Sequence, residues 1–330
     1  KIDVHAHFVP DFYKDALYEH LHANPDGMPG IPDWTLQKHL AMMDKLGISK
    51  SILSLSSPGL LLEHGHGNDH DYVQLARKIN EYAADLKQRY PTRLGFFACL
   101  PLPDLSSACA EVERAWMDDC DGFVMMTNYG GKYLGDHDFD ALFDKMNTRK
   151  TLVFIHPTTP CIHVNVPPPD NPPPVMAAPL EKEHRVPHFE FLIDTARAVS
   201  NLFVNGFIEK FPNITYILPH VGGCFPPLFD RIIEYAHAVP PRPFGEPPRD
   251  REKAREQFRT RFYFDLAGWP FSDEPPSDPK APCGQVTALL RGYNISPDKF
   301  LYGTDYPFAT EEIVTDLTKK MEKHIEGMDE

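Results

Sequence analysis

Short apolar runs that end in a potential metal ligand recur along the whole chain. The first run carries His5 and His7, and later runs close on His156, His220 and Asp305. Residues so far apart in sequence converge most simply if the runs are parallel strands, because the carboxyl ends of parallel strands meet at one edge. The pattern therefore predicts a metal site on an α/β barrel.

Eight such runs can be counted, and their lengths are typical of buried parallel strands. They lie at 2–7, 51–55, 94–100, 122–126, 152–156, 214–220, 262–266 and 300–305. Helical patterns alternate with them at 34–46, 71–89, 106–116, 139–146, 191–211, 226–236 and 311–324. This alternation predicts one (β/α)8 TIM barrel domain over residues 1–330, rather than a doubly wound sheet with a second domain.

Proline interrupts this scaffold in two places. The chain has 34 prolines, about twice the usual share. Many of them crowd into insertions near 161–187 and 240–258, the second with its prolines at 240–248. Because proline removes backbone donors, we expect long irregular loops there, serving either as rigid surface loops or as lids or subunit contacts.

The charge balance excludes several partner classes. Thirty-three Lys and Arg against 47 Asp and Glu give a formal charge of −14, which argues against a nucleic-acid partner or an anionic membrane surface. No apolar run approaches the length of a membrane span. The six cysteines show no C-x-x-C spacing, so we interpret them as reduced thiols. We expect a cytoplasmic protein that binds a small molecule.

The ligand set itself indicates one divalent ion. His5 and His7 are two residues apart, so on a strand both side chains point to the same side. We assign His5, His7, His156 and Asp305 as ligands, with an open position for substrate or water. Imidazole and carboxylate together suit Zn²⁺, and also Mn²⁺ or Fe²⁺. His220 is a fifth ligand, an acid or base near the ion, or a structural histidine.

Other histidines fit less specific roles. His64 and His66 imitate the H-x-H pattern, but they lie among Gly65, Gly67 and Asn68, so we interpret the segment as a solvated loop. His39 lies in a predicted helix without partner ligands.

The motifs around these ligands resemble those of the amidohydrolase superfamily. The resemblance rests on Val-His5-Ala-His7, Phe-Ile-His156-Pro, Leu-Pro-His220-Val-Gly-Gly with Pro226 and Arg231, and Tyr-Gly-Thr-Asp305-Tyr-Pro. It covers nearly the whole chain and includes Asp194-Thr-Ala-Arg197. Within that superfamily the chain is similar to the metal-dependent non-oxidative decarboxylases, which include aminocarboxymuconate semialdehyde decarboxylase and the fungal 6-methylsalicylate decarboxylases.

The resemblance implies a single metal ion and no organic cofactor. Binuclear amidohydrolases use a strand-four lysine, whereas the run at 122–127 has none. Some decarboxylases of this branch carry Glu in place of the first histidine and resemble Mn²⁺ enzymes, so His5 shifts the expectation toward Zn²⁺, with Mn²⁺ as the alternative. The chain has no dinucleotide or P-loop motif. Relatives of this kind form dimers, and we expect a homodimer.

The activity implied is decarboxylation of an ortho-hydroxybenzoic acid, with 6-methylsalicylate giving m-cresol and carbon dioxide. Such a substrate can chelate the ion through a carboxylate oxygen and its phenolic oxygen. By resemblance Asp305 delivers a proton to the ring carbon, and His220 hydrogen-bonds the carboxylate or carries the proton to Asp305. Arg231 either binds substrate charge, reaches a neighbouring subunit or is a surface arginine; Ser57 either binds a ring substituent or is a turn serine.

Two other functional classes remain open from the sequence. The same metal can activate water for hydrolysis of a lactone or amide, because fold and ligands do not decide the reaction class. A catalytically inactive barrel that serves as a scaffold is the third class, although the ligand set is intact.

Overall fold

The computed structural model describes residues 1–62, 71–162, 175–180, 182–238, 249–270 and 284–326, apart from the side chains of 71 and 324–326. Its centre is a sheet of eight strands in the order β1-β2-β3-β4-β7-β10-β11-β12, and every pair is parallel. The strands are β1 (Ile2–His7), β2 (Lys50–Ser54), β3 (Leu94–Cys99), β4 (Gly122–Met126), β7 (Leu152–His156), β10 (Thr215–Leu218), β11 (Phe262–Asp265) and β12 (Phe300–Leu301).

The two edges of this sheet meet. Asp3 bridges to Tyr302, just past β12, and Ala6 bridges to Tyr306. The backbone N–H of Val4 donates to the Tyr302 carbonyl at 3.0 Å, and that of His7 donates to the Tyr306 carbonyl at 2.7 Å. The expected (β/α)8 barrel is therefore confirmed.

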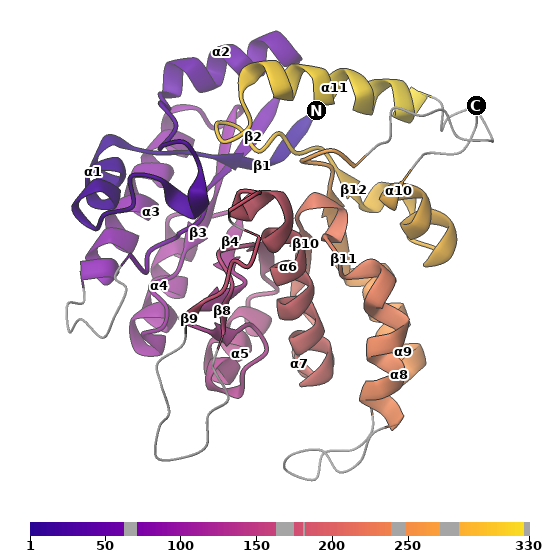
Figure 1. Ribbon diagram of the computed structural model, residues 1–330. Coiled ribbons are helices and arrows are strands. Elements are labelled where there is room, and N and C mark those ends of the chain that lie inside the picture. Colours follow the sequence, from indigo (N-terminus) through magenta and orange to yellow (C-terminus); the bar gives the residue numbers. More distant parts are fainter. Residues whose placement is uncertain (63–70, 163–174, 181, 239–248, 271–283, 327–330) are drawn as a thin grey trace.

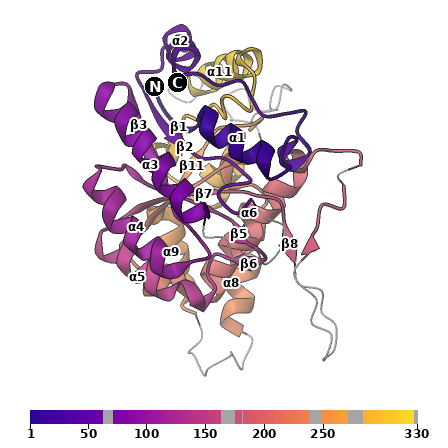
Figure 2. The same cartoon turned by 90° about the vertical axis from the view of Figure 1, so that its left-hand side faces the viewer.

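Helices surround the strands, as Figures 1 and 2 show from two directions. They are α1 (Asp11–Glu19), α2 (Leu36–Leu46), α3 (Asp71–Arg89), α4 (Leu105–Met117), α5 (Asp140–Thr148), α6 (Val186–Val204), α7 (Phe207–Lys210), α8 (Phe229–Ala238), α9 (Arg251–Arg261), α10 (Gln285–Thr287) and α11 (Glu311–Glu326). In both views α11 lies beside α2. Local sequence explains the ends of α2, because the Thr35 hydroxyl caps its first turn and Gly47, at φ 64°, ends it.

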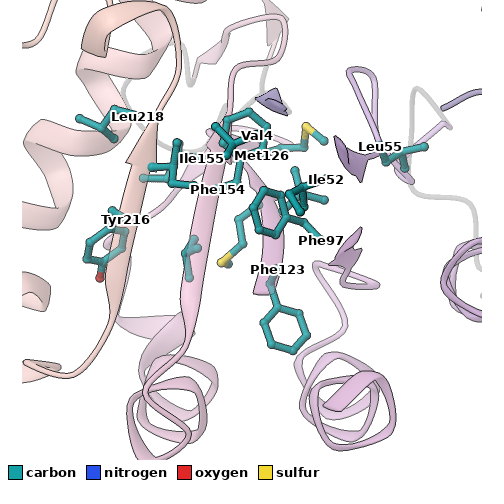
Figure 3. Close-up of a cluster of buried hydrophobic side chains, with 14 of the residues drawn as sticks. Val4, Ile52, Leu55, Phe97, Phe123, Met126, Phe154, Ile155, Tyr216 and Leu218 are labelled. Carbon is teal, nitrogen blue, oxygen red and sulfur yellow. The ribbon is translucent and has the colours of Figure 1, made fainter. Parts of the chain in front are cut away.

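The barrel interior is filled by large side chains that support the site from below. Side chains from several strands gather there, among them Phe97 and Phe154 (Figure 3). Phe154 and His156 are two residues apart, so both lie on the inward face of β7. The Phe154 ring centroid lies 5.7 Å from that of Phe97 and 5.0 Å from that of His5. Since packed cores resist displacement, these contacts hold the histidine rings in place.

Two predicted strands are shorter in the structure. The sixth run was expected to reach residue 220 and the eighth to reach 305, but β10 ends at Leu218 and β12 at Leu301. His220 has φ 52° and Asp305 has φ 59°, which is left-handed backbone that a strand does not contain. Both potential ligands therefore lie in turns beyond the strands.

The proline-rich insertions contain more regular structure than the sequence indicated. In the first, the described part includes a short hairpin of β8 (Cys161–Ile162) with β9 (Val175–Met176), and α6 begins at Val186. In the second, the prediction of a loop to residue 258 is wrong, because α9 covers Arg251–Arg261. The Asp250 side chain caps this helix by accepting from the Lys253 N–H at 3.0 Å. The prolines end at Pro248, so nothing prevents a helix after them.

A second hairpin, β5 (Asn128–Tyr129) with β6 (Lys132–Tyr133), follows β4. Within the described ranges no helix is long and apolar enough to cross a membrane. The five described cysteines are free thiols, as expected.

Candidate metal centre

The five potential ligands meet at the carboxyl ends of the strands. His5 and His7 lie on one face of β1, and His156 is the last residue of β7. Ligand atoms of His5, His7 and His156 all lie within 4.8 Å of one another, and the same holds for His5, His220 and Asp305. The convergence predicted from sequence is thus present in the fold.

The donor atoms fit a divalent cation. Nε2 of His5, Nε2 of His7 and Nδ1 of His220 are buried, and none has a hydrogen-bond partner among the described residues. Buried polar atoms without partners are rare in folded proteins, and a metal ion would satisfy them. Asp305 adds a carboxylate, since its Oδ1 lies 3.2 Å from His7 Nε2 and 3.5 Å from His5 Nε2. This set of imidazoles and one carboxylate suits Zn²⁺ or Mn²⁺.

Hydrogen bonds at the other ring nitrogen orient three of the histidines. Nδ1 of His7 donates to the Ser54 carbonyl at 3.2 Å, and Nδ1 of His156 donates to the Pro157 carbonyl at 2.6 Å. Nδ1 of His5 donates to Oδ2 of Asp265 at 2.9 Å. Each bond leaves Nε2 as the lone-pair nitrogen, which is the form that binds a metal.

Asp265 is a functional residue that the sequence reasoning missed. It ends β11, is fully buried, and its Oδ1 accepts from the backbone N–H of His220 at 3.0 Å and of Ala267 at 3.1 Å. One carboxylate therefore orients the His5 ring and the backbone of the His220 turn. The indication in the sequence was an aspartate within the apolar run 262–266, because a buried carboxylate needs partners.

The electrostatics of the site favour a cation. Burial alone would lower the pKa of His5, but the Asp265 and Asp305 carboxylates raise it to about 10, so without an ion the ring holds a second proton on Nε2 that a bound cation would displace. Burial lowers the pKa of His7, His156 and His220, so these rings are neutral at neutral pH and available as ligands. Burial would raise the pKa of Asp305, yet interactions with His5 and His7 hold it well below its usual value.

A second buried aspartate joins β1 to the Asp305 turn. Asp3 accepts from the Thr304 N–H at 3.1 Å, from the Thr304 hydroxyl at 2.7 Å and from the His5 N–H at 3.2 Å. The Asp305 N–H then donates to the His5 carbonyl at 2.7 Å. These bonds hold the left-handed Asp305 residue against β1, where its carboxylate reaches the histidines.

The structure places the two predicted substrate-binding residues, Ser57 and Arg231, in different environments. Ser57 lies past the end of β2, is buried, and its hydroxyl is 2.8 Å from that of Thr158, two residues after His156. Arg231 lies on α8, is exposed, and packs its guanidinium 4.9 Å from the Tyr235 ring centroid. In the part of the chain that the structure describes, no hydrogen bond or ion pair joins Arg231 to the ligand set.

One of the two further histidine predictions falls within the described residues. His39 is buried in α2; its Nδ1 accepts from Trp34 Nε1 at 3.1 Å, and its Nε2 donates to the Ser51 hydroxyl at 3.0 Å. It is a structural histidine whose two hydrogen bonds the sequence did not indicate. His64 and His66 lie outside the described residues.

The family of the chain follows from comparison with known proteins. The model of the amidohydrolase family matches residues 2–325, and the chain belongs to this family of enzymes. It is 33% identical to decarboxylase yanB of Aspergillus niger over 340 residues, covering 98% of this chain and 81% of the relative. It is 30% identical to a 6-methylsalicylic acid decarboxylase of Penicillium expansum over 331 residues, covering 98% of this chain and 90% of the relative.

Solved structures agree with the fold. A crystal structure of an amidohydrolase II matches with a TM-score of 0.75 at 30% identity, covering 96% of this chain and 90% of that one. The dihydroxybenzoic acid decarboxylase of Polaromonas sp. JS666, solved with manganese and the inhibitor 2-nitroresorcinol, matches with a TM-score of 0.67. Its identity is 21%, and the match covers 96% of this chain and 89% of that one.

Proposed function

We propose that this protein is a metal-dependent non-oxidative decarboxylase of an ortho-hydroxybenzoic acid, with 6-methylsalicylate as the first candidate substrate. The observation that carries the proposal is the ligand set of His5, His7, His156 and Asp305, in a chain whose relatives include aromatic acid decarboxylases. The products would be the phenol, here m-cresol, and carbon dioxide.

A divalent ion held by these four residues would draw electron density from the carboxylate and phenolic oxygens of such a substrate. Zinc is the first choice, and manganese, present in the Polaromonas structure, is the alternative. The buried histidines exclude water from one side of the centre. The Asp305 side chain, 28% exposed, leaves a side from which a substrate can enter.

Asp305 would act as the acid. Because a carboxylate that binds a divalent cation is ionised, its carboxyl proton would have to arrive with the substrate, and the phenolic hydroxyl would be one source. Asp305 would deliver that proton to the ring carbon that bears the carboxylate. The carbon–carbon bond would then break, its electron pair would restore the aromatic ring as a phenolate, and carbon dioxide would leave. The phenolate would take up a proton from water to give the phenol.

His220 would assist as a hydrogen-bonding group. Burial lowers its pKa, so the neutral ring can accept and return a proton at neutral pH. From the turn after β10 it would hold the reacting carboxylate or carry the proton to Asp305. Ser57 and Arg231 stay proposals as substrate-binding residues, Arg231 through a homodimer partner.

The test is a panel of compounds offered to the metal-loaded protein. We expect carbon dioxide and m-cresol in equal amounts from 6-methylsalicylate, or the corresponding phenol from another ortho-hydroxybenzoate. Asp305→Asn should lower kcat by a factor of roughly 10² or more while metal stays bound. Turnover of lactones or amides, with no carbon dioxide from any ortho-hydroxybenzoate, would replace the proposal with hydrolysis.

A further inference from the structure

Four polar side chains form a hydrogen-bonded group beside the metal centre, and we call it the Asp26 cluster: Asp26, Ser57, Thr158 and Thr159. The Thr159 hydroxyl donates to Oδ1 of Asp26, and the Ser57 and Thr158 hydroxyls are 2.8 Å apart. The Ser57 hydroxyl also interacts with the Asp26 carboxylate. None of these contacts serves the metal ligands directly, so the cluster needs an explanation of its own.

The cluster bridges the part of the barrel mouth that has no metal ligand. The four proposed ligands and His220 come from the ends of β1, β7, β10 and β12, whereas β2, β3 and β4 form a continuous arc that contributes none of these residues. Ser57 follows β2 and Thr158 follows β7, which are the strands on either side of β3 and β4. The contact between the Ser57 and Thr158 hydroxyls therefore spans this arc at the carboxyl ends of its strands.

Contacts from the end of β4 fix the threonines. The Thr158 N–H donates to the Thr127 hydroxyl oxygen at 3.2 Å, and the Asn128 side chain donates to the Thr159 carbonyl at 3.3 Å. Ser57, Thr158 and Thr159 are all buried, at 3%, 9% and 8% exposure. The hydroxyls are thus held in place before any ligand arrives.

Asp26 is the partly exposed member, and its conformation is unusual. It lies in the segment between α1 and α2 with φ 53°, a left-handed conformation that costs free energy for most non-glycine residues. Burial raises the pKa of its carboxyl group, and hydrogen bonds from Thr159 and Ser57 partly offset that rise. An acceptor held this way at a site edge fits a ligand that supplies a further donor.

A substrate that binds the ion through its carboxylate and ortho-hydroxyl would turn the opposite edge of its ring toward the arc of β2, β3 and β4. If the carboxylate and the ortho-hydroxyl face His5, His7, His156 and Asp305, then ring positions 4 and 5 point away from them. We propose that Asp26 determines specificity by accepting a hydrogen bond from a second hydroxyl at position 4 or 5 of the ring. This inference rests on the proposed function and extends it to dihydroxybenzoates.

The test compares hydroxyl with methyl at the same ring position. Wild type and Asp26→Asn are assayed with 2,4- and 2,5-dihydroxybenzoate and with 2-hydroxy-4-methyl- and 2-hydroxy-5-methylbenzoate. Asparagine tolerates left-handed backbone, so this variant keeps the loop. In wild type we expect a hydroxyl-to-methyl ratio of kcat/KM of about ten or more at one position, falling about tenfold in Asp26→Asn, as the loss of a charge-assisted hydrogen bond predicts. The intrinsic reactivity of each compound is the same with both enzymes, so it cancels when the ratio for wild type is compared with the ratio for Asp26→Asn.

Asp33→Asn is the matched control, because Asp33 is an exposed carboxylate in the same loop that pairs with Lys38. Its ratio should equal that of wild type. An unchanged ratio in Asp26→Asn, or no preference for hydroxyl in wild type, overturns the inference while leaving decarboxylation intact. If no compound releases carbon dioxide, the proposed function fails. In that case calorimetry gives the dissociation constants of the hydroxyl and methyl compounds for wild type and for Asp26→Asn. The change in their hydroxyl-to-methyl ratio between the two proteins then decides the role of Asp26.

Discussion

At the scale of single residues, two buried aspartates hold the proposed metal ligands in place. Asp265 connects the His5 ring to the backbone of the His220 turn, and Asp3 connects β1 to the Thr304 and Asp305 turn. Neither is assigned as a ligand. Each positions groups from strands that are distant in sequence, so changes at these residues should alter metal binding or stability before they alter chemistry.

Asp265→Asn should weaken metal binding. The amide carries no charge to support the His5 ring, and its NH2 group would face backbone donors that now bond to the carboxylate. We expect the metal dissociation constant, measured by competition with a chelator, to rise by roughly 10 to 100-fold. Asp121→Asn is the control, because Asp121 accepts from Phe96 at the far ends of the strands. Equal metal affinity in both variants would contradict the role of Asp265.

Asp3 should make stability depend on pH. Burial raises its pKa from about 3.8 to about 7, so between these values the folded state binds more protons than the unfolded state. The free energy of unfolding therefore falls as pH rises from 4 to 7, by about 4 kcal/mol at most. Asn mimics the protonated carboxyl group, because its NH2 group can donate to the Thr304 hydroxyl oxygen. The free energy of unfolding of Asp3→Asn should therefore not fall in this way between pH 4 and pH 7.

The measurement is denaturant unfolding of both metal-stripped proteins between pH 4 and pH 8. The difference between wild type and Asp3→Asn isolates this group from the other carboxylates. If the free energies of unfolding of the two proteins change with pH in parallel over that range, Asp3 does not titrate there.

At the scale of elements, the turns after the strands carry more of the site than the strands themselves. Only His5, His7 and His156 lie on strands, whereas His220 and Asp305 lie in left-handed turns. The His220 turn is held against α6, because the Cys224 N–H donates to the Leu192 carbonyl at 3.0 Å. Packing between a helix and a turn thus determines where His220 lies.

Gly223→Ala should disturb this packing. Gly223 has φ 57°, and a Cβ there would lie 2.6 Å from the Leu192 carbonyl oxygen. We expect a loss of about 3 kcal/mol or more in unfolding free energy, together with reduced carbon dioxide release. Gly47→Ala is the control, since Gly47 has φ 64° but open space around it, and should lose about 1 kcal/mol. Equal losses in the two variants would show that the contact with α6 is unimportant.

At the scale of the whole molecule, the eight strands, the barrel and the convergence of ligands were predictable because each depends on local patterns. Apolar runs of strand length, and ligands at their ends, are visible in a single sequence. The partners of those ligands were not. Asp265 contacts His5 across the barrel, and no local pattern pairs the two residues. The same holds for Asp26, which is not a partner of the ligands but contacts Thr159 from a distant segment of the chain.

Other differences have equally physical causes. The helix α9 follows a proline-rich segment, which obscured its pattern, and its high charge gives little apolar periodicity. The place of Arg231 depended on the direction of α8, which the spacing from His220 did not determine. On α8 the residue faces solvent and stacks on Tyr235.

The central claim is that one divalent ion, bound in this barrel, supports decarboxylation. Its most direct test is titration of the metal-stripped protein with Zn²⁺, and separately with Mn²⁺, in the presence of an ortho-hydroxybenzoate substrate. We expect the rate of carbon dioxide release to rise linearly and to level off at one ion per chain. A plateau at two ions per chain, or no carbon dioxide at any loading of either ion, would contradict the account.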